Sequence, residues 1–123
     1  AIRTYYLLGE LNSKYSQKTE ETIDKAIELA PTDTKLYYNK AVLLGATGKI
    51  EAAIDAASYA ISLKSNYKDA YIALGLFYFD KDQKEQAVKS LNKALAISPG
   101  DQEALNYLNA WGEKGVATNS GKQ

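Results

Sequence analysis

The feature that most constrains this chain is an internal repeat of 34 residues. Residues 34–67 (TKLYYNKAVLLGATGKIEAAIDAASYAISLKSNY) align without a gap onto residues 68–101 (KDAYIALGLFYFDKDQKEQAVKSLNKALAISPGD). Small or apolar residues match in fixed order at Tyr37 and Tyr71, Ala41 and Gly75, Leu44 and Tyr78, Ala53 and Ala87, Ala57 and Leu91, and Ala60 and Ala94. A period of this length predicts stacked copies of one supersecondary unit, because one copy alone cannot bury its apolar face.

Each copy contains two helical patterns separated by a polar turn. In residues 68–101 the small and apolar residues are three or four positions apart, which places them on one face of a helix. They are Tyr71, Leu74, Gly75 and Tyr78 in the first pattern, and Ala87, Leu91, Ala94 and Leu95 in the second. Each copy is therefore predicted to be a helix-turn-helix.

Polar residues indicate where these helices begin. Asp82, followed three residues later by Glu85, has the pattern of a capping box and predicts the start of a second helix. Gly48-Lys49 forms the equivalent turn one copy earlier. Asn66 and Asp101 are predicted to cap the helices that follow them.

The start of the chain is predicted to be a third copy, over residues 1–33, with a turn two residues shorter around residues 13–18. Residues 102–113 predict one further helix, which would cover the apolar end of the stack. Residues 1–113 would then form a single domain, and residues 114–123 a flexible tail. Because Ala1 opens directly into an apolar periodic stretch without a methionine, we expect the chain to be a fragment of a longer protein.

This pattern resembles the tetratricopeptide repeat family. The family signature is a large aromatic residue, Leu-Gly, Tyr, Ala, an apolar residue, Ala and Pro, and it is present as Tyr71, Leu74, Gly75, Tyr78, Ala87, Leu91, Ala94 and Pro99. The middle copy departs from the signature at Lys40, where Leu is usual, and at Ser65, where Pro is usual. The resemblance implies an all-α, right-handed superhelical α-solenoid of three helix-turn-helix repeats plus a C-terminal capping helix, seven helices in all.

Residues that carry common enzyme chemistry are scarce. The chain has no histidine, cysteine or methionine, which removes the most common general base, the thiolate nucleophile and the main imidazole and sulfur metal ligands. Residues 45–49 (GATGK) lack the four-residue spacing between glycines of a phosphate-binding loop. A calcium loop starting at Asp80 would need glycine where Glu85 lies. We therefore expect no catalysis, no cofactor and no metal.

Charge and hydropathy restrict the partners. Fifteen Lys and Arg balance fifteen Asp and Glu, so the chain lacks the basic field that attracts nucleic acid. It also lacks an apolar run long enough to insert into a membrane directly. A protein or a peptide is the expected partner.

The resemblance also implies where such a partner would bind, because first helices in this family line a concave groove. The groove positions carry over to Tyr6, Glu10, Lys35, Tyr38, Asn39, Val42, Asp69, Ile72, Ala73, Leu76, Phe79, Asn106 and Tyr107. Aromatic side chains with polar tips are common anchors in such surfaces. The alternative for Ile72, Leu76 and Phe79 is that they only pack against neighbouring repeats.

Two functional hypotheses remain open. In the first, the groove binds a peptide or partner protein; in the second, the chain is a structural unit that self-associates or stacks on other domains of a longer protein. Family members that bind the C-terminal carboxylate of heat-shock chaperones use three basic residues and two asparagines, of which only Asn39 is kept. Glu10 and Asp69 occupy two of the other positions and would repel a carboxylate, so a chaperone tail is not the expected ligand.

Overall fold

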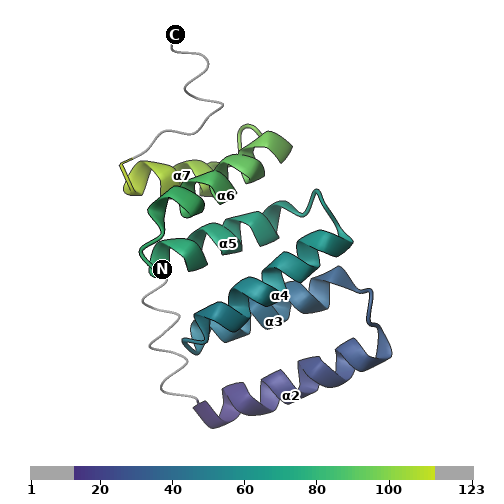
Figure 1. Cartoon of the computed structure of the whole chain (residues 1–123). Helices are drawn as coiled ribbons and strands as arrows, with labels where there is room; N and C mark the ends of the chain where they lie inside the picture. The colour runs from purple at the N-terminus through teal and green to yellow at the C-terminus, as the bar shows by residue number, and fades with distance from the viewer. Residues whose placement is uncertain (1–12, 113–123) are drawn as a thin grey trace. The chain divides into compact units, whose positions relative to one another are not determined.

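The computed structural model describes residues 13–112, and in this range it contains six α-helices and no strand. The helices are α2 (Ser13–Leu29), α3 (Thr34–Ala46), α4 (Ile50–Leu63), α5 (Lys68–Asp80), α6 (Lys84–Ile97) and α7 (Gln102–Ala110) (Figure 1). The all-α prediction is confirmed. The helix predicted to open the first repeat lies outside the described residues.

The described residues fall into two compact units that meet between residues 65 and 66 of the sequence. In the first unit, α3 and α4 form a helical hairpin and α2 lies against α3 (Figure 1). In the second unit, α5 and α6 form the equivalent hairpin and α7 lies against α6. The hairpins α3–α4 and α5–α6 fall within the two 34-residue copies read from the sequence.

Alanines allow the two helices of the first hairpin to approach closely. Ala41 of α3 and Ala53, Ala57 and Ala60 of α4 are completely buried. A hydrogen bond of 2.7 Å from the hydroxyl of Thr34, at the start of α3, to the carbonyl oxygen of Ala60, near the end of α4, also connects the two helices. Small residues at these positions set the helix separation, since larger ones would force the backbones apart.

In the second hairpin the same contact is built with a different pair of sizes. Gly75 takes the place of Ala41, and Leu91 takes the place of Ala57. A Cβ atom placed on Gly75 would lie 2.9 Å from Cγ and Cδ2 of Leu91 and 3.3 Å from the carbonyl oxygen of Ala87. The larger side chain on α6 therefore fits only because α5 carries no side chain opposite it.

The predicted helix caps were partly wrong. Asp101 does cap α7, with its side chain accepting a hydrogen bond from the backbone N–H of Ala104 at 2.9 Å. Helix α5, however, begins after Tyr67 rather than Asn66, and α6 begins after Gln83 rather than Asp82.

Asp82 instead adopts the left-handed conformation in the turn, with φ of 63°, and Gly48 has φ of 84° at the matching position one repeat earlier. Aspartate is among the few residues other than glycine that tolerate this region. The turn geometry is thus shared by both repeats and needs no capping box at Asp82.

Two boundaries also differ from the sequence prediction. Helix α2 already begins at Ser13, so the shortened turn placed around residues 13–18 is wrong there. Helix α7 ends at Ala110 and is followed by a turn at Trp111 and Gly112, whose φ of 78° stops the helix before residue 113.

The departures of the middle copy from the signature have local explanations. The ammonium group of Lys40 lies 2.7 Å from the carboxylate of Asp24, so α2 provides a charge partner where a leucine contact is usual. A second ion pair, between Lys49 and Glu20 at 3.4 Å, joins α2 to the start of α4. Ser65 does not move the helix end, since α4 and α6 stop at matching positions, Leu63 and Ile97.

The size match between Gly75 and Leu91 can be tested by a double-mutant cycle. Gly75→Ala should lower the free energy of unfolding by about 1–2 kcal/mol, because overpacking against buried Leu91 outweighs the gain in helix propensity. Leu91→Ala leaves a cavity and should cost about 2–5 kcal/mol. The double variant reproduces the alanine pair of the first hairpin and should cost less than the two changes added together. Additive losses in chemical denaturation would contradict the match.

The close contact at Ala87 makes a second stability prediction. Ala87→Phe should lower the free energy of unfolding by about 1–3 kcal/mol or more, because Ala87 is completely buried between α5 and α6. Lys89→Phe, on the exposed side of the same helix, should change it by less than about 0.5 kcal/mol. Thermal unfolding followed by circular dichroism would measure both, and an unchanged midpoint for Ala87→Phe would contradict the helix pairing.

Candidate protein-binding surface

Helix α3 presents the predicted site residues of the first unit. Lys35, Tyr38, Asn39 and Val42 follow the spacing i, i+3, i+4, i+7 and so share one helix face. Lys35 and Asn39 are exposed, whereas Tyr38 and Val42 are half-buried. The side chain of Asp33 anchors the start of this helix by accepting a hydrogen bond of 3.1 Å from the backbone N–H of Lys35.

Helix α5 presents only part of the site predicted in the second unit. Asp69 is exposed, Leu76 is half-buried and Phe79 is 38% exposed. Ile72 and Ala73 are only 3% and 6% exposed, so neither has a surface to offer to a ligand. Ile72 instead belongs to the core cluster that includes Leu91, Ala94, Leu95, Ala104 and Leu108.

Helix α7 contributes two predicted residues. The side-chain oxygen of Asn106 accepts a hydrogen bond of 3.0 Å from the side-chain amide of Gln102, one turn earlier on the exposed side of the helix. Tyr107 is half-buried and packs against the core cluster around Ile72 and Leu108. Both are therefore held in place by neighbours. Tyr6 and Glu10, the two predicted residues of the opening helix, lie outside the described residues.

An aromatic stack connects the ends of α5 and α7. The rings of Phe79 and Trp111 have centroids 4.2 Å apart and planes that differ by 3°. Tyr107 approaches Trp111 at 6.0 Å between centroids. Trp111 was missing from the predicted site because it lies beyond the repeat signature. Its spacing of four residues from Tyr107 was the available sequence signal.

An ion pair connects the beginnings of the same two helices. The ammonium group of Lys68 lies 2.6 Å from the carboxylate of Asp101, whose other oxygen caps α7. The pKa of Asp101 is lowered, first by the hydrogen bond from Lys68 and then by that from the backbone N–H of Ala104. The pKa of Lys68 is raised, first by its hydrogen bond to Asp101, with further contributions from the carboxylates of Asp69 and Glu103. Lys68 is thus surrounded by carboxylates.

We call the surface that lies between these two connections the α5–α7 surface. It comprises Asp69, Leu76, Phe79 and Asp80 of α5 together with Glu103 and Tyr107 of α7 and the adjoining Trp111. Ile72 lies beneath it in the core. The ion pair at one end and the aromatic stack at the other hold its two helices in register.

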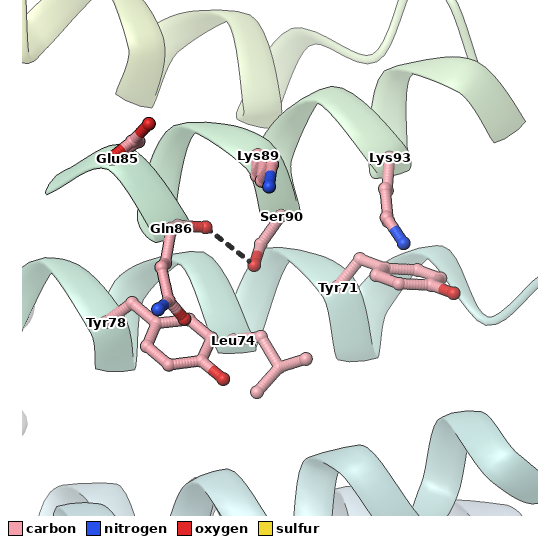
Figure 2. A pocket seen from close by; sticks show the side chains of 8 residues that line it. All are labelled: Tyr71, Leu74, Tyr78, Glu85, Gln86, Lys89, Ser90 and Lys93. Carbon is pink, nitrogen blue, oxygen red and sulfur yellow. Dashed lines mark hydrogen bonds between the residues drawn. The ribbon is translucent and has the colours of Figure 1, made fainter. Parts of the chain in front are cut away.

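A separate pocket of about 450 Å³ lies beside α5 and α6. Figure 2 shows its lining residues, which are Tyr71, Leu74 and Tyr78 of α5 and Glu85, Gln86, Lys89, Ser90 and Lys93 of α6. The hydroxyl of Ser90 donates a hydrogen bond of 3.0 Å to the carbonyl oxygen of Gln86 within its own helix. Its lining combines lysines with a glutamate, so it has no field of one sign that would select a charged ligand.

The described residues also lack two other kinds of site. Across residues 17–112, no three or more acidic, histidine or cysteine side chains gather in a way that could hold a metal ion. In the same part of the chain, every helix is too short or too polar to cross a bilayer. The α5–α7 surface has apolar and aromatic area with hydrogen-bonding and charged groups at its edges. This composition is suited to contact with another protein chain.

Models of one protein family match the sequence twice. Tetratricopeptide repeat models match residues 22–55 and residues 68–101, and the second match coincides with the repeat formed by α5 and α6. Together the two matches cover more than half of the 123 residues. The chain belongs to the tetratricopeptide repeat family, and its fold is an all-α helical solenoid of such repeats.

Several curated proteins are similar over most of this chain. A TPR repeat-containing protein of Methanocaldococcus jannaschii is 31% identical over 125 residues, covering 98% of this chain and 22% of that protein. The protein STIP1 homolog of Dictyostelium discoideum is 33% identical over 97 residues, covering 79% of this chain and 17% of that protein. The chain thus spans about a fifth of the length of these relatives.

Solved structures show the same fold. The crystal structure of MamA is 26% identical, has a TM-score of 0.72, and is matched over 97% of this chain and 73% of MamA. The first TPR domain of Spaghetti (RPAP3), solved with an HSP90 peptide, is 19% identical with a TM-score of 0.74, over 99% of this chain and 94% of that one. Tetratricopeptide domains generally mediate protein–protein interactions and are known as non-catalytic modules.

The Lys68–Asp101 pair predicts how the stability of the second unit depends on pH. Asp101→Asn keeps an oxygen that can cap α7 but removes the charge, so the wild type should be the more stable above about pH 5. Because the pKa of Asp101 is lowered in the folded state, its contribution is present above the unfolded-state pKa of about 4. This contribution is lost as the pH falls through the folded-state pKa. Unfolding midpoints of both proteins between pH 2 and 7 should therefore converge at the acidic end, and a constant difference would contradict this role for the charge.

Proposed function

We propose that this chain binds a peptide or a partner protein through the outward faces of its first helices and performs no catalysis. In the first unit the binding residues are Lys35, Tyr38, Asn39 and Val42 of α3. In the second unit they are the residues of the α5–α7 surface.

The observation that carries this proposal is the α3 face. This face carries one basic, one aromatic, one amide and one aliphatic side chain. None of the four belongs to the small-residue contact that holds the hairpin together. Asn39 is exposed and can both donate hydrogen bonds to a peptide main chain and accept them from it. Tyr38 and Val42 beside it offer apolar area. Such a combination of a polar tether and apolar neighbours is suited to an extended or helical peptide.

The family supports the class of ligand, since TPR domains generally bind proteins and the Spaghetti domain holds an HSP90 peptide in its structure. The ligand proposed for this chain differs from a chaperone carboxylate tail. Asn39 is kept among the residues that would hold such a tail, but Asp69 and Ala73 stand where basic residues are needed. Asp69 is exposed and would repel a carboxylate.

A pair of substitutions, one in each unit, tests the proposal. Asn39→Ala with Leu76→Ala removes a hydrogen-bonding group from α3 and apolar area from α5. Phe79 is left in place because its stacking on Trp111 also supports the fold. Immobilised protein would capture partners from an extract of the source organism, and quantitative mass spectrometry would compare the variants. The double variant should bind its partner at least about tenfold more weakly, the scale of one hot-spot residue.

The matched control is Asp55→Ala with Lys89→Ala, which changes one exposed residue on the second helix of each hairpin. It should capture the same partners as the wild type. Equal capture by the Asn39→Ala, Leu76→Ala variant would move the binding surface elsewhere. The self-associating structural unit would be favoured instead by two results together: both variants still capture the partners, and the molar mass measured by light scattering rises with protein concentration.

A further inference from the structure

The carboxylates of the α5–α7 surface lie at the two ends of its apolar centre. On α5, Asp69, Leu76 and Asp80 are seven and four residues apart, so the two carboxylates lie on the same face as Leu76, at opposite ends of the helix. On α7, Glu103 lies in the first turn, beside the start of α5. All three carboxylates belong to exposed residues.

These charges have no ion-pair partner among the described residues. The ion pairs in residues 17–112 include Lys40 with Asp24, Lys49 with Glu20, and Lys68 with Asp101, and none of these three involves Asp69, Asp80 or Glu103. Lys68 feels the carboxylates of Asp69 and Glu103, but its hydrogen bond is made to Asp101. One cation therefore faces three carboxylates at this end of the surface.

The other end of the surface is also acidic. Asp80 follows Phe79, and partial burial raises the pKa of its carboxyl group. The lysine that follows it, Lys81, is the C-cap of α5 and is turned by about 100° around the helix relative to Asp80. Within residues 17–112, the apolar centre formed by Leu76, Phe79, Tyr107 and Trp111 thus has an excess of negative charge at both ends, although the whole chain has a net charge of zero.

We propose that the α5–α7 surface binds a segment whose apolar or aromatic centre is flanked by lysine or arginine side chains. This inference rests on the proposed function, which assigns ligand binding to the first-helix faces, and it names the chemistry of the ligand. The aromatic side chains supply apolar contact area at the centre. Asp69 and Glu103 at one end and Asp80 at the other attract the flanking cations and disfavour acidic segments.

Three synthetic peptides provide the probe. They share the centre LFPLF, have blocked termini, and differ only in the pairs of residues on each side, which are lysine, glutamine or glutamate. Trp111 is the only tryptophan in the chain and lies in the surface, so its fluorescence reports binding of these tryptophan-free peptides. The lysine peptide should bind about three- to tenfold more tightly than the glutamine peptide at low salt, and the glutamate peptide more weakly than both. The difference should shrink at about 0.5 M salt.

A charge-neutral variant shows whether the carboxylates cause this preference. Asp69→Asn with Glu103→Gln should abolish the preference, so that the lysine peptide and the glutamine peptide bind this variant with equal affinity. The control, Asp55→Asn with Glu85→Gln, removes two negative charges from exposed positions of α4 and α6 and should keep the preference.

The outcomes separate this inference from the proposed function. Equal binding of all three peptides, or tighter binding of the glutamate peptide, would overturn the charge preference and leave peptide binding intact. The same holds if the control variant loses the preference as fully as the Asp69→Asn, Glu103→Gln variant does. If none of the peptides changes Trp111 fluorescence up to millimolar concentration, the α5–α7 surface is not a ligand site, and the proposed function itself fails for the second unit.

Discussion

The structure depends on the close approach of two helices within each repeat. That approach is possible because residues without bulk stand at the contact, Ala41 and Ala57 in one hairpin and Gly75 in the other. Closely packed interiors tolerate neither added nor missing volume, so a larger residue on one helix requires a smaller one opposite. The replacement of an alanine pair by Gly75 and Leu91 keeps this balance. The residues of α3 and α5 that do not face the second helix of their own hairpin are available for contacts outside it, as Ile72 shows by packing with α7.

The second unit shows how packing contacts shape the surface that we propose as a ligand site. Lys68 and Asp101 connect the beginnings of α5 and α7, and Phe79 and Trp111 connect their ends. Asp101 serves twice, because the carboxylate that pairs with Lys68 also caps α7. Ile72 is buried beneath this surface and packs in the apolar core with residues of α6 and α7. Preorganised side chains lose less entropy when a partner binds, which favours recognition by the residues that remain exposed.

Most of the fold could be predicted because it follows from local sequence. The matched spacing of residues such as Tyr37 and Tyr71 gave the helices and their pairing, since a helix face is set by residues three or four apart. Helix starts were harder. Asp82 looked like a cap but occupies a left-handed turn position, because its short polar side chain tolerates the conformation that Gly48 adopts in the previous repeat.

The sequence by itself determined the repeat, the helical hairpins, the family and the line of candidate residues along α3. Only the tertiary structure decided that Ile72 and Ala73 are buried while Phe79 stays partly exposed, although all three lie close together on α5. It also brought Trp111 to Phe79 and Asp101 to Lys68, across separations of about thirty residues. The physical reason is that periodicity specifies which residues share a helix face, whereas burial and pairing depend on which other helix covers that face. Ile72 of α5 shows this, because its core cluster includes Ala104 and Leu108 of α7, a helix that lies beyond the repeat that the sequence pattern describes.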